Sequence, residues 1–261
     1  MKPNKSLWYA AKSFLVEAQN RITRKVVLLG LHKTNEPELI RLGSYYGGWW
    51  VPVEALSQGF DSKVCISVGI GGDVTFDREL LEVRYRVIAL DPLEQCVSFA
   101  NETLADYSKF TAIPAGLWNQ AGTQRFFSPK NSEHDAWSAT NSQATPIEES
   151  QSFPVITLLD VLCEYPEVSI SEYSILKMDI EGAEIEIIQD ICSSNHRFNW
   201  LAIEMDCLSM IPFRSLRYRV IIIRKAKKLL QELGENGYVF RSNEKYNFFW
   251  IDGRNIHDPD F

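Results

Sequence analysis

A glycine-rich turn between two short apolar runs constrains this chain more than any other feature. Residues 64–68 (Val-Cys-Ile-Ser-Val) have the pattern of a buried strand, and three glycines within four residues follow it. Residues 74–83 then mix apolar and charged side chains, as an amphipathic helix does. Residues 85–90 indicate a second strand, which ends at Asp91. This order of strand, glycine turn, helix, strand and acid predicts the first βαβ unit of a nucleotide-binding sheet.

The turn and the acid together suit an adenosine ligand. Gly69 and Gly71 let the backbone bend tightly, so that bare N–H groups can face a ligand. Asp91 is placed to accept hydrogen bonds from both ribose hydroxyls, because an ionised carboxylate offers only acceptors. A dinucleotide fingerprint would need a glycine where Val74 stands, and the chain has no Gly-Lys-Ser/Thr phosphate loop. We therefore expect an adenosine ligand without a pyrophosphate, and S-adenosylmethionine is such a ligand.

The composition limits the classes of protein to which the chain can belong. Its 261 residues, 45% of them hydrophobic, suggest one α/β domain (residues 61–261) with an N-terminal extension (residues 1–60). The net charge of −7 argues against a nucleic-acid substrate held by its phosphates. Five scattered cysteines without a CxxC pair favour reduced residues of a cytoplasmic protein over disulfides or a zinc site. No apolar run is long enough for a signal peptide or a membrane span.

The N-terminal extension differs in pattern from the rest of the chain. Apolar residues recur at three- and four-residue spacing between Leu7 and Ile22, which predicts a helix whose apolar face packs on the domain. The alternatives for this face are a membrane surface and a dimer contact. Residues 36–39 indicate the start of a second helix. Residues 43–52 hold four aromatic residues among three glycines, which form either an aromatic wall beside the ligand, with Trp49, or a cap over the sheet.

Strands and helices alternate after the first βαβ unit, as a parallel sheet requires. The predicted elements are strands at 111–115, 174–179 and 200–204, helices at 94–107, 184–193 and 212–233, and two antiparallel strands at 238–241 and 247–251. The helix at 212–233 is basic, with Val220, Ile223, Ala226 and Leu230 expected to face inward. Its charged face is either solvated or receives a phosphate-bearing sugar donor or carrier.

A segment poor in large apolar residues spans residues 128–152. A loop of this length in a compact domain is usually functional or disordered. We interpret it as a mobile lid over the ligand, with His134 and Trp137 as its contact points. The alternative is a flexible insertion without a role in the site.

Acidic residues follow several of the predicted strands. Asp91, Asp179 and Glu204 stand at strand ends, and Glu181 comes two residues after Asp179. Because ligands bind beyond the carboxyl ends of the strands in an open α/β sheet, we expect these acids to share one cleft with the glycine turn. The alternative is that each acid caps the helix that follows it.

Three motifs resemble those of a known family. Residues 176–184 (Leu-Lys-Met-Asp-Ile-Glu-Gly-Ala-Glu) resemble the LK-D-EGAE signature of the FkbM-type S-adenosylmethionine-dependent methyltransferases. Residues 67–77 and 89–92 are similar to the first two motifs of that family, and the resemblance extends over residues 44–252. It implies an α/β, Rossmann-like class I methyltransferase fold. In that fold a mostly parallel seven-stranded sheet ends in an antiparallel C-terminal hairpin.

The resemblance also implies the residues that bind the cofactor. They are Ser67, Gly69, Gly71, Asp73, Asp91 and Leu117. Many relatives carry an acid where Ser67 stands. Its loss would weaken contact with the methionine end of S-adenosylmethionine, for which Asp73 could compensate.

The reaction expected from these residues is in-line transfer of the sulfonium methyl group to a small acceptor. The methyl group is already activated, so the protein mainly aligns donor and acceptor, and a general base helps an alcohol to lose its proton. The candidates for that base are Asp179, Glu181 and His134. The residues expected to contact the acceptor are Trp137, Glu204 and Trp49.

The resemblance suggests a hydroxyl on a sugar, a glycan or a natural product as the acceptor. Methylation of an amide or amine nitrogen, a nicotinamide-dependent oxidoreductase and an inactive module that binds S-adenosylmethionine are the alternatives. We predict no metal, because the chain has no histidine-rich ligand set. A homodimer is left open.

Overall fold

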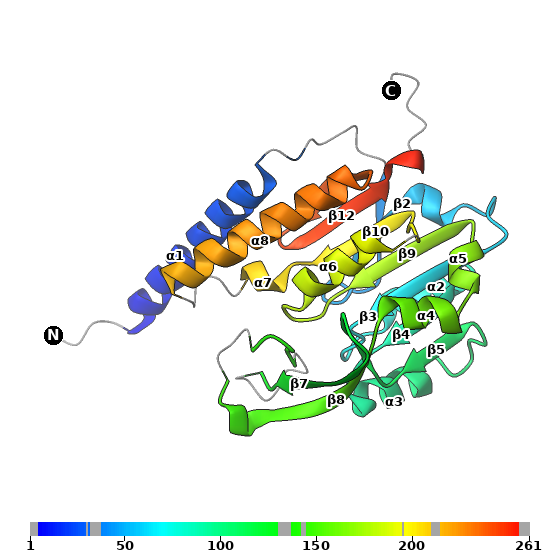
Figure 1. Cartoon of the computed structure of the whole chain (residues 1–261), viewed down its shortest axis with the longest axis horizontal. Coiled ribbons are helices and arrows are strands. Elements are labelled where there is room, and N and C mark those ends of the chain that lie inside the picture. Colours follow the sequence, from blue (N-terminus) through cyan, green and yellow to red (C-terminus); the bar gives the residue numbers. More distant parts are fainter. Residues whose placement is uncertain are drawn as a thin grey trace, which may run out of the picture.

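The computed structural model describes residues 5–29, 31, 38–129, 137–141, 145–194, 196–209 and 215–255. A seven-stranded sheet with the order β11-β12-β10-β9-β3-β4-β5 forms its centre (Figure 1). Its strands are β3 (Lys63–Val68), β4 (Arg86–Leu90), β5 (Phe110–Ile113), β9 (Tyr173–Met178), β10 (Trp200–Glu204), β11 (Tyr238–Glu244) and β12 (Asn247–Asp252). The pairs among β3, β4, β5, β9 and β10 are parallel, whereas β12 runs antiparallel to both β10 and β11. This arrangement confirms the predicted Rossmann-like fold.

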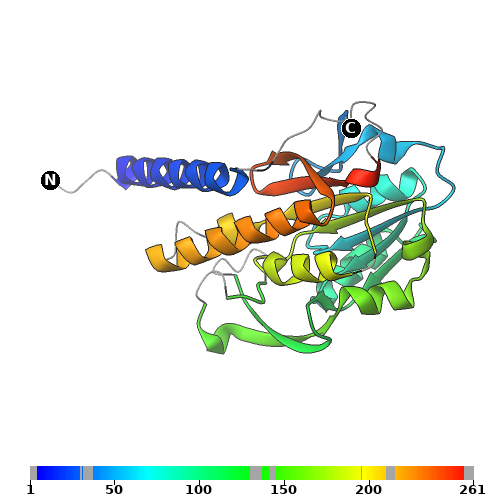
Figure 2. The ribbon, with the colours of Figure 1, turned by 45° about the horizontal axis from the view of Figure 1, so that its top comes forward.

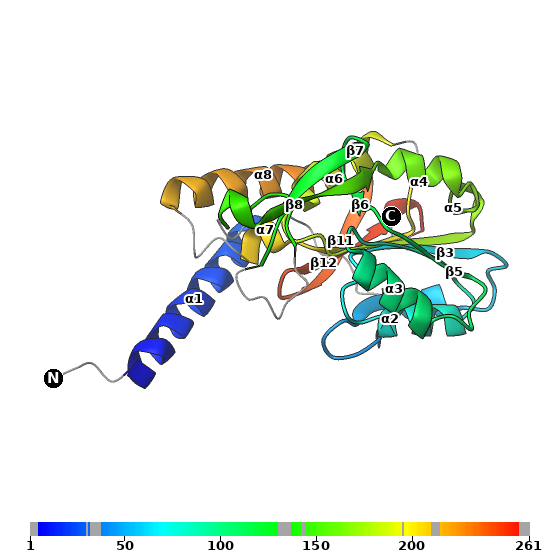
Figure 3. The same ribbon diagram turned by 90° about the horizontal axis from the view of Figure 1, so that it is seen from below.

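Helices cover both faces of this sheet, as Figure 3 shows from below. The helices are α1 (Lys5–Leu28), α2 (Thr75–Glu82), α3 (Glu94–Thr103), α4 (Leu158–Glu164), α5 (Glu167–Ile170), α6 (Glu184–Ser193), α7 (Asp206–Ser209) and α8 (Leu216–Glu235). One apolar layer joins the sheet to α4, α6 and α8, and a second joins it to α2 and α3. Every residue of β3 and of β9 is buried, because each strand faces both layers.

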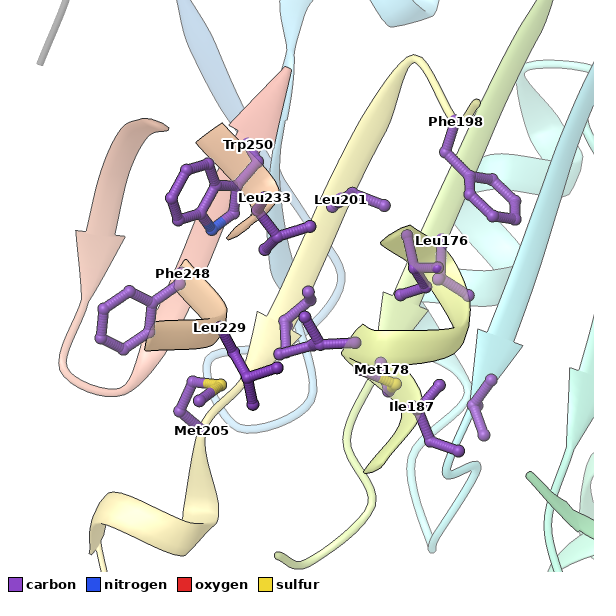
Figure 4. Packing of buried hydrophobic residues seen from close by; sticks show 14 of the residues in the cluster. Leu176, Met178, Ile187, Phe198, Leu201, Met205, Leu229, Leu233, Phe248 and Trp250 are labelled. Atoms are coloured by element: carbon purple, nitrogen blue, oxygen red, sulfur yellow. The ribbon is translucent and has the colours of Figure 1, made fainter. Parts of the chain in front are cut away.

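The first layer shows how the sheet holds its helices (Figure 4). Leu176 and Met178 of β9 and Leu201 of β10 point from the sheet toward the two helices that cover it. There they share one apolar cluster with Ile187 of α6 and Leu229 of α8, and all five side chains are almost fully buried. Burial of one such side chain contributes roughly 1.5–3 kcal/mol. The central strands are therefore fixed, and so are the loops at their carboxyl ends.

Two smaller sheets lie beside the main sheet. The first is an antiparallel hairpin of β1 (Leu39–Leu42) and β2 (Trp49–Pro52). The second has the order β6-β8-β7, with β6 (Gly116–Leu117), β7 (Gly122–Phe127) and β8 (Ser150–Ile156). Short 3₁₀ turns complete the chain: η1 (Val53–Leu56), η2 (Ile147–Glu149) and η4 (Gly253–Asn255).

Three local predictions differ from the structure. Leu39 begins a strand and not a helix, because Leu42, Trp49 and Val51 are buried against α2 and β10 when this segment is extended. The aromatic segment likewise ends in β2. Residues 150–152 belong to β8, so part of the predicted lid is a strand paired with β7.

The apolar face of α1 also differs from the prediction. Phe14, Leu15 and Ile22 are 74%, 61% and 62% exposed, so this part of the face points away from the domain, while the side chains of Leu7, Trp8 and Ala11 lie outside the described ones. The helix instead packs through the adjacent side, where Thr23 and Val27 are buried. On α8, Ala226 and Leu230 face inward as expected, but Val220 is 40% exposed. Within the described part of the chain, no helix is long and apolar enough to span a bilayer.

Candidate functional site

The carboxyl ends of β3, β4, β9 and β10 open into a cavity of about 660 Å³. Ten of the predicted site residues line it: Trp49, Gly69, Gly71, Asp73, Asp91, Leu117, Trp137, Asp179, Glu181 and Glu204. The structure does not bring Ser67 to this cavity. His134 lies outside the described residues.

Asp91 organises the glycine turn from behind. Its Oδ2 accepts hydrogen bonds from the backbone N–H groups of Ile70 (2.9 Å) and Gly71 (3.1 Å), and its Oδ1 accepts one from Leu93 (2.9 Å). Burial raises the pKa of Asp91, and these three hydrogen bonds oppose that effect. A carboxylate accepts about four hydrogen bonds, so about one position is left for a ribose hydroxyl.

The turn needs glycine at its first position. Gly69 has φ +82°, and a Cβ there would overlap the backbone carbonyl oxygen of Asp179. Gly71, at φ +56°, faces open space. The turn therefore lies flat against the end of β9 on one side and opens to the cavity on the other.

Ser67 lies on the side of the turn that faces away from the cavity. Its side chain is fully buried in β3, near Asp77 of α2. Burial raises the pKa of Asp77, while the Lys177 charge and the Ser67 hydroxyl oppose that rise. Ser67 thus belongs to the support of the turn.

Lys177 is a site residue that the sequence reasoning missed. It is 6% exposed, and its Nζ donates hydrogen bonds to the carbonyl oxygens of Val68 (3.1 Å) and Gly69. The Nζ also lies 5.5 Å from the centre of the Trp49 ring. A single lysine within the apolar run of a central strand was the available signal, because a buried charge must have partners.

Asp73 anchors the loop between β1 and β2 over the cavity. Its Oδ2 accepts from the Ser44 hydroxyl (2.5 Å), and its Oδ1 accepts from the Thr75 backbone N–H (2.9 Å) and hydroxyl (2.5 Å). Burial alone would raise the pKa of Asp73, but these hydrogen bonds outweigh it and lower the pKa. Both carboxylate oxygens are thus engaged by the protein.

A second contact fixes the same loop from the opposite side. Arg41 pairs with Glu244 of β11 at 2.7 Å and donates to the backbone carbonyl of Tyr45 at 3.0 Å. Glu244 also accepts a hydrogen bond from the Trp50 indole at 3.0 Å. The loop residues Tyr45 and Tyr46 line the cavity and are 90% and 85% exposed, so they stand at its mouth.

A cluster of carboxylates occupies the other half of the cavity. Asp179, Glu181 and Asp206 place oxygen atoms within 4.8 Å of one another, and Glu204 lines the same wall. Burial raises the pKa of Glu181 to about 8, with the charges of Asp179 and Glu184 adding to it. Burial followed by the charges of Asp179 and Glu181 raises the pKa of Glu204 to about 8. The cluster therefore retains protons at neutral pH.

Two acids that the sequence reasoning did not assign to the site lie at this cluster. Glu184 is fully buried and accepts hydrogen bonds from the backbone N–H groups of Gly182 (2.6 Å) and Cys207 (3.4 Å), so its carboxylate has a structural role. Asp206 lines the cavity two residues beyond the end of β10, at the first residue of α7. Burial followed by the charge of Glu181 raises the pKa of Asp206 well above the ordinary value.

The segment that contains Trp137 contacts the cluster directly. Trp137 lines the cavity and packs edge-on against Phe153 of β8, with ring centres 5.5 Å apart. The Ser138 hydroxyl donates to the backbone carbonyl of Glu181 at 2.5 Å. Glu181 has φ +54°, a strained conformation for glutamate, so this hydrogen bond helps to hold its backbone in place.

The match to a family model decides the relationship of this chain. The model for the methyltransferase FkbM domain matches residues 32–240. The chain belongs to the FkbM methyltransferase family. The matched region of this methyltransferase includes the glycine turn, Asp91 and the carboxylate cluster, whereas α1 precedes it.

Other comparisons add little to this assignment. A search of curated proteins found no match. Among solved structures, a chain described as "Human methyltransferase 10 domain containing protein" is similar, with 14% sequence identity and a TM-score of 0.37. That alignment covers 90% of this chain and 96% of the other.

Proposed function

We propose that this FkbM methyltransferase binds S-adenosylmethionine in the cavity and methylates a hydroxyl on a sugar, a glycan or a natural product. The observation that carries the proposal is the glycine turn, which is held by Asp91 and shares one cavity with Asp179 and Glu181. The cofactor supplies a methyl group already activated by a sulfonium charge.

The residues present fit this cofactor. Gly71 faces open space, and about 660 Å³ is in the range of cavities that enclose a small-molecule ligand. Gly69, Gly71 and the remaining acceptor position of Asp91 would hold the amino-acid and ribose parts, and Leu117 would line the cofactor's side of the cavity. Asp73 contributes through the loop that it anchors, because Ser44 and Thr75 already engage both of its oxygens.

Carboxylates of the cluster would accept the acceptor's proton. Glu181 is the first candidate, because a pKa of about 8 makes it a base of useful strength near neutral pH. Asp179 lies beside it and is the second candidate, with His134 as a third. Trp49, Trp137 and Glu204 line the cavity and would position the acceptor. The rings of Trp49 and Trp137 would exclude water from the cavity, which would help to hold the acceptor hydroxyl in line with the methyl group.

The charge of the cavity favours an amine as a second candidate acceptor. Its acidic lining residues are Asp73, Asp91, Asp179, Glu181, Glu204, Asp206 and Glu244, and its basic ones are Arg41, Lys177 and Lys245. Above about pH 8, where Glu181 and Glu204 have lost their protons, this excess of acid would attract an ammonium group and repel a phosphate. A panel of neutral sugars, amines and sugar phosphates, assayed with the same cofactor, separates these classes. Activity on sugar phosphates alone would contradict the charge argument.

The metal-free reaction stays a prediction. Three carboxylates of the cluster are hard oxygen donors, so they are where a divalent cation would bind if the prediction is wrong. Activity that EDTA abolishes and Mg²⁺ restores would show that outcome. Unchanged activity in EDTA is the result that we expect.

The cofactor is tested by calorimetric titration with S-adenosylhomocysteine. We expect micromolar binding by the wild type, and we expect Asp91→Ala to lose it because the turn loses two hydrogen bonds and the backbone N–H of Leu93 loses a third. Asp106→Ala, at an exposed position beyond α3, is the matched control and should bind normally. Circular dichroism and thermal melting of each variant exclude misfolding as the cause.

Absence of binding by the folded wild type would overturn the proposal, and NAD would then be titrated to test the oxidoreductase alternative. Binding without turnover on any acceptor class would favour the inactive module.

A further inference from the structure

The helix pair α1 and α8 carries an exposed surface that the proposed reaction does not use. The two helices contact each other and extend beyond the sheet at the same end of the molecule (Figures 1 and 2), and they diverge toward their outer ends in Figure 3. The exposed apolar side chains of this surface are Phe14, Leu15, Ile22, Val26 and Leu29 from the α1 region, and Leu216, Val220 and Ile221 from α8. We define these residues, with the exposed basic residues Arg21, Lys25, Arg217, Arg224, Lys225 and Lys228, as the helix-pair surface.

The apolar residues of α1 form a continuous stripe and are not scattered. Phe14, Leu15, Ile22 and Val26 recur at spacings that place them on one side of a helix, next to the side on which Thr23 and Val27 are buried. Scattered exposed hydrophobic residues are common on protein surfaces, but a contiguous stripe indicates a binding surface.

The charge of the two helices sets them apart from the rest of the chain. Helix α1 carries five basic residues against one acidic residue, and α8 carries six against two. The whole chain has a net charge of −7, so the remainder is strongly acidic. Positive charge is thus concentrated beside the exposed apolar stripe. This combination is typical of helices that lie in the plane of an anionic membrane surface.

We propose that the helix-pair surface docks on an anionic phospholipid bilayer. The apolar stripe of α1 would enter the interface between headgroups and acyl chains, and basic residues of α1 and α8 would contact lipid phosphates. No helix of the described residues could span the bilayer, so the docking is peripheral. This inference is independent of the cofactor and the acceptor.

A second copy of the chain fits the same surface less well. A symmetric dimer through the α1 stripes would bring the basic residues that flank them, Arg21 and Lys25 among them, into one interface, and like charges repel. The charge pattern therefore favours lipid.

Docking through this surface would place the cavity near the bilayer. Helix α7 packs against both α1 and α8, and its first residue, Asp206, lines the cavity. The carboxylate half of the cavity therefore lies next to the helix pair. A bilayer contacted by these helices would be close to the site.

Flotation of the full chain with vesicles tests the proposal. We expect binding to vesicles of phosphatidylcholine with about 30% phosphatidylserine as a probe composition, about tenfold weaker binding to pure phosphatidylcholine, and a steep decrease with added salt. The triple variant Phe14→Ser, Leu15→Ser, Ile22→Ser should lose binding. The double variant Arg21→Glu, Lys25→Glu should bind anionic vesicles roughly tenfold or more weakly.

Matched controls lie on the far part of the molecule. Leu159→Ser with Ile170→Ser removes two apolar side chains that are 67% and 79% exposed on α4 and α5, and Lys109→Glu with Arg125→Glu reverses two exposed charges. Both control proteins should float as the wild type does.

Equal flotation by the α1 variants and the wild type would overturn the proposal, as would no flotation of the wild type. Sedimentation equilibrium tests the competing explanation, which is a dimer formed through this surface. A dimer that dissociates in the α1 triple variant, without vesicle binding by the wild type, would assign the surface to a second copy.

Discussion

The two halves of the cavity use carboxylates in opposite ways. At the ends of β3 and β4, Asp91 is surrounded by donors and accepts three backbone hydrogen bonds. Burial raises the pKa of Asp91, but these hydrogen bonds oppose that rise. At the ends of β9 and β10, Asp179, Glu181, Glu204 and Asp206 face one another, and the charges of neighbouring acids add to the effect of burial on the pKa of Glu181, Glu204 and Asp206. The first half is preorganised for binding, whereas the second holds protons that chemistry can use.

Lys177 joins these two halves. Its Nζ donates to the carbonyls of Val68 and Gly69 in the turn, and its charge opposes the rise in the pKa of Asp179, Glu204 and Asp91. A single cation therefore shapes the turn and limits repulsion among the acids. Substitutions in each half would show how far that half depends on this cation and on its neighbours.

The largest effect is expected for Lys177→Met. The variant removes the charge that acts on Asp179 and Glu204 and the hydrogen bonds from Nζ to the carbonyls of Val68 and Gly69. Removal of one partner of a buried charged network costs about 3–5 kcal/mol, and urea denaturation at pH 7 measures this loss. Lys109→Met, at an exposed position, should change the free energy of unfolding by less than about 0.5 kcal/mol. Equal stability of the two variants would mean that Lys177 does not balance the cluster.

Glu181→Gln separates the roles of the two halves. We expect methyl transfer to fall about 100-fold, because a general base is removed, while the affinity for S-adenosylhomocysteine changes little. Glu82→Gln, at an exposed end of α2, is the control and should leave both quantities unchanged. Loss of cofactor affinity without an effect on a saturated rate would assign Glu181 to binding.

The pH dependence of the wild type should show opposite trends in rate and stability. Folding raises the pKa of Glu181 from 4.5 to about 8, so the folded state binds more protons than the unfolded state between these values. Stability from this group is therefore fully present below about pH 4.5 and is lost as the pH rises through about 8. The rate should rise over the upper part of the same window as Glu181 loses its proton. In Glu181→Gln, both pH dependences should be weaker, and unchanged profiles would exclude Glu181 as their source.

Much of the first half of the cavity could be predicted from the sequence. The turn, the helix after it and Asp91 follow one another within a short stretch, so local periodicity and glycine chemistry were sufficient. Helix α6 and strand β10 have the bounds that the pattern predicted. The apolar pattern of each segment matches the burial of its side chains in the structure.

The second half was harder to predict, because it depends on contacts between distant segments. Asp206 joins Asp179 and Glu181 only after β10 has paired with β9. Lys177 lies within one of the family motifs, but its partners, Val68 and Gly69, lie more than a hundred residues earlier. The predicted direction of the α1 apolar face was wrong for a related reason. Periodicity shows that a helix has an apolar face, but it does not identify what that face contacts.

The smallest effect is expected at the loop over the cavity. Arg41→Met removes the ion pair with Glu244 and a hydrogen bond to Tyr45, and the pair is partly exposed. An ion pair of this kind contributes about 1 kcal/mol or less, so the melting temperature should fall only slightly. The loop holds Tyr45 and Tyr46 at the cavity mouth, so the KM for the acceptor should rise a few-fold while kcat stays near the wild-type value. Arg84→Met, at an exposed position after α2, is the matched control. A fall in kcat with an unchanged acceptor KM would place the loop on the chemical step and not on acceptor binding, and the contrast between a binding half and a chemical half would then need a different boundary.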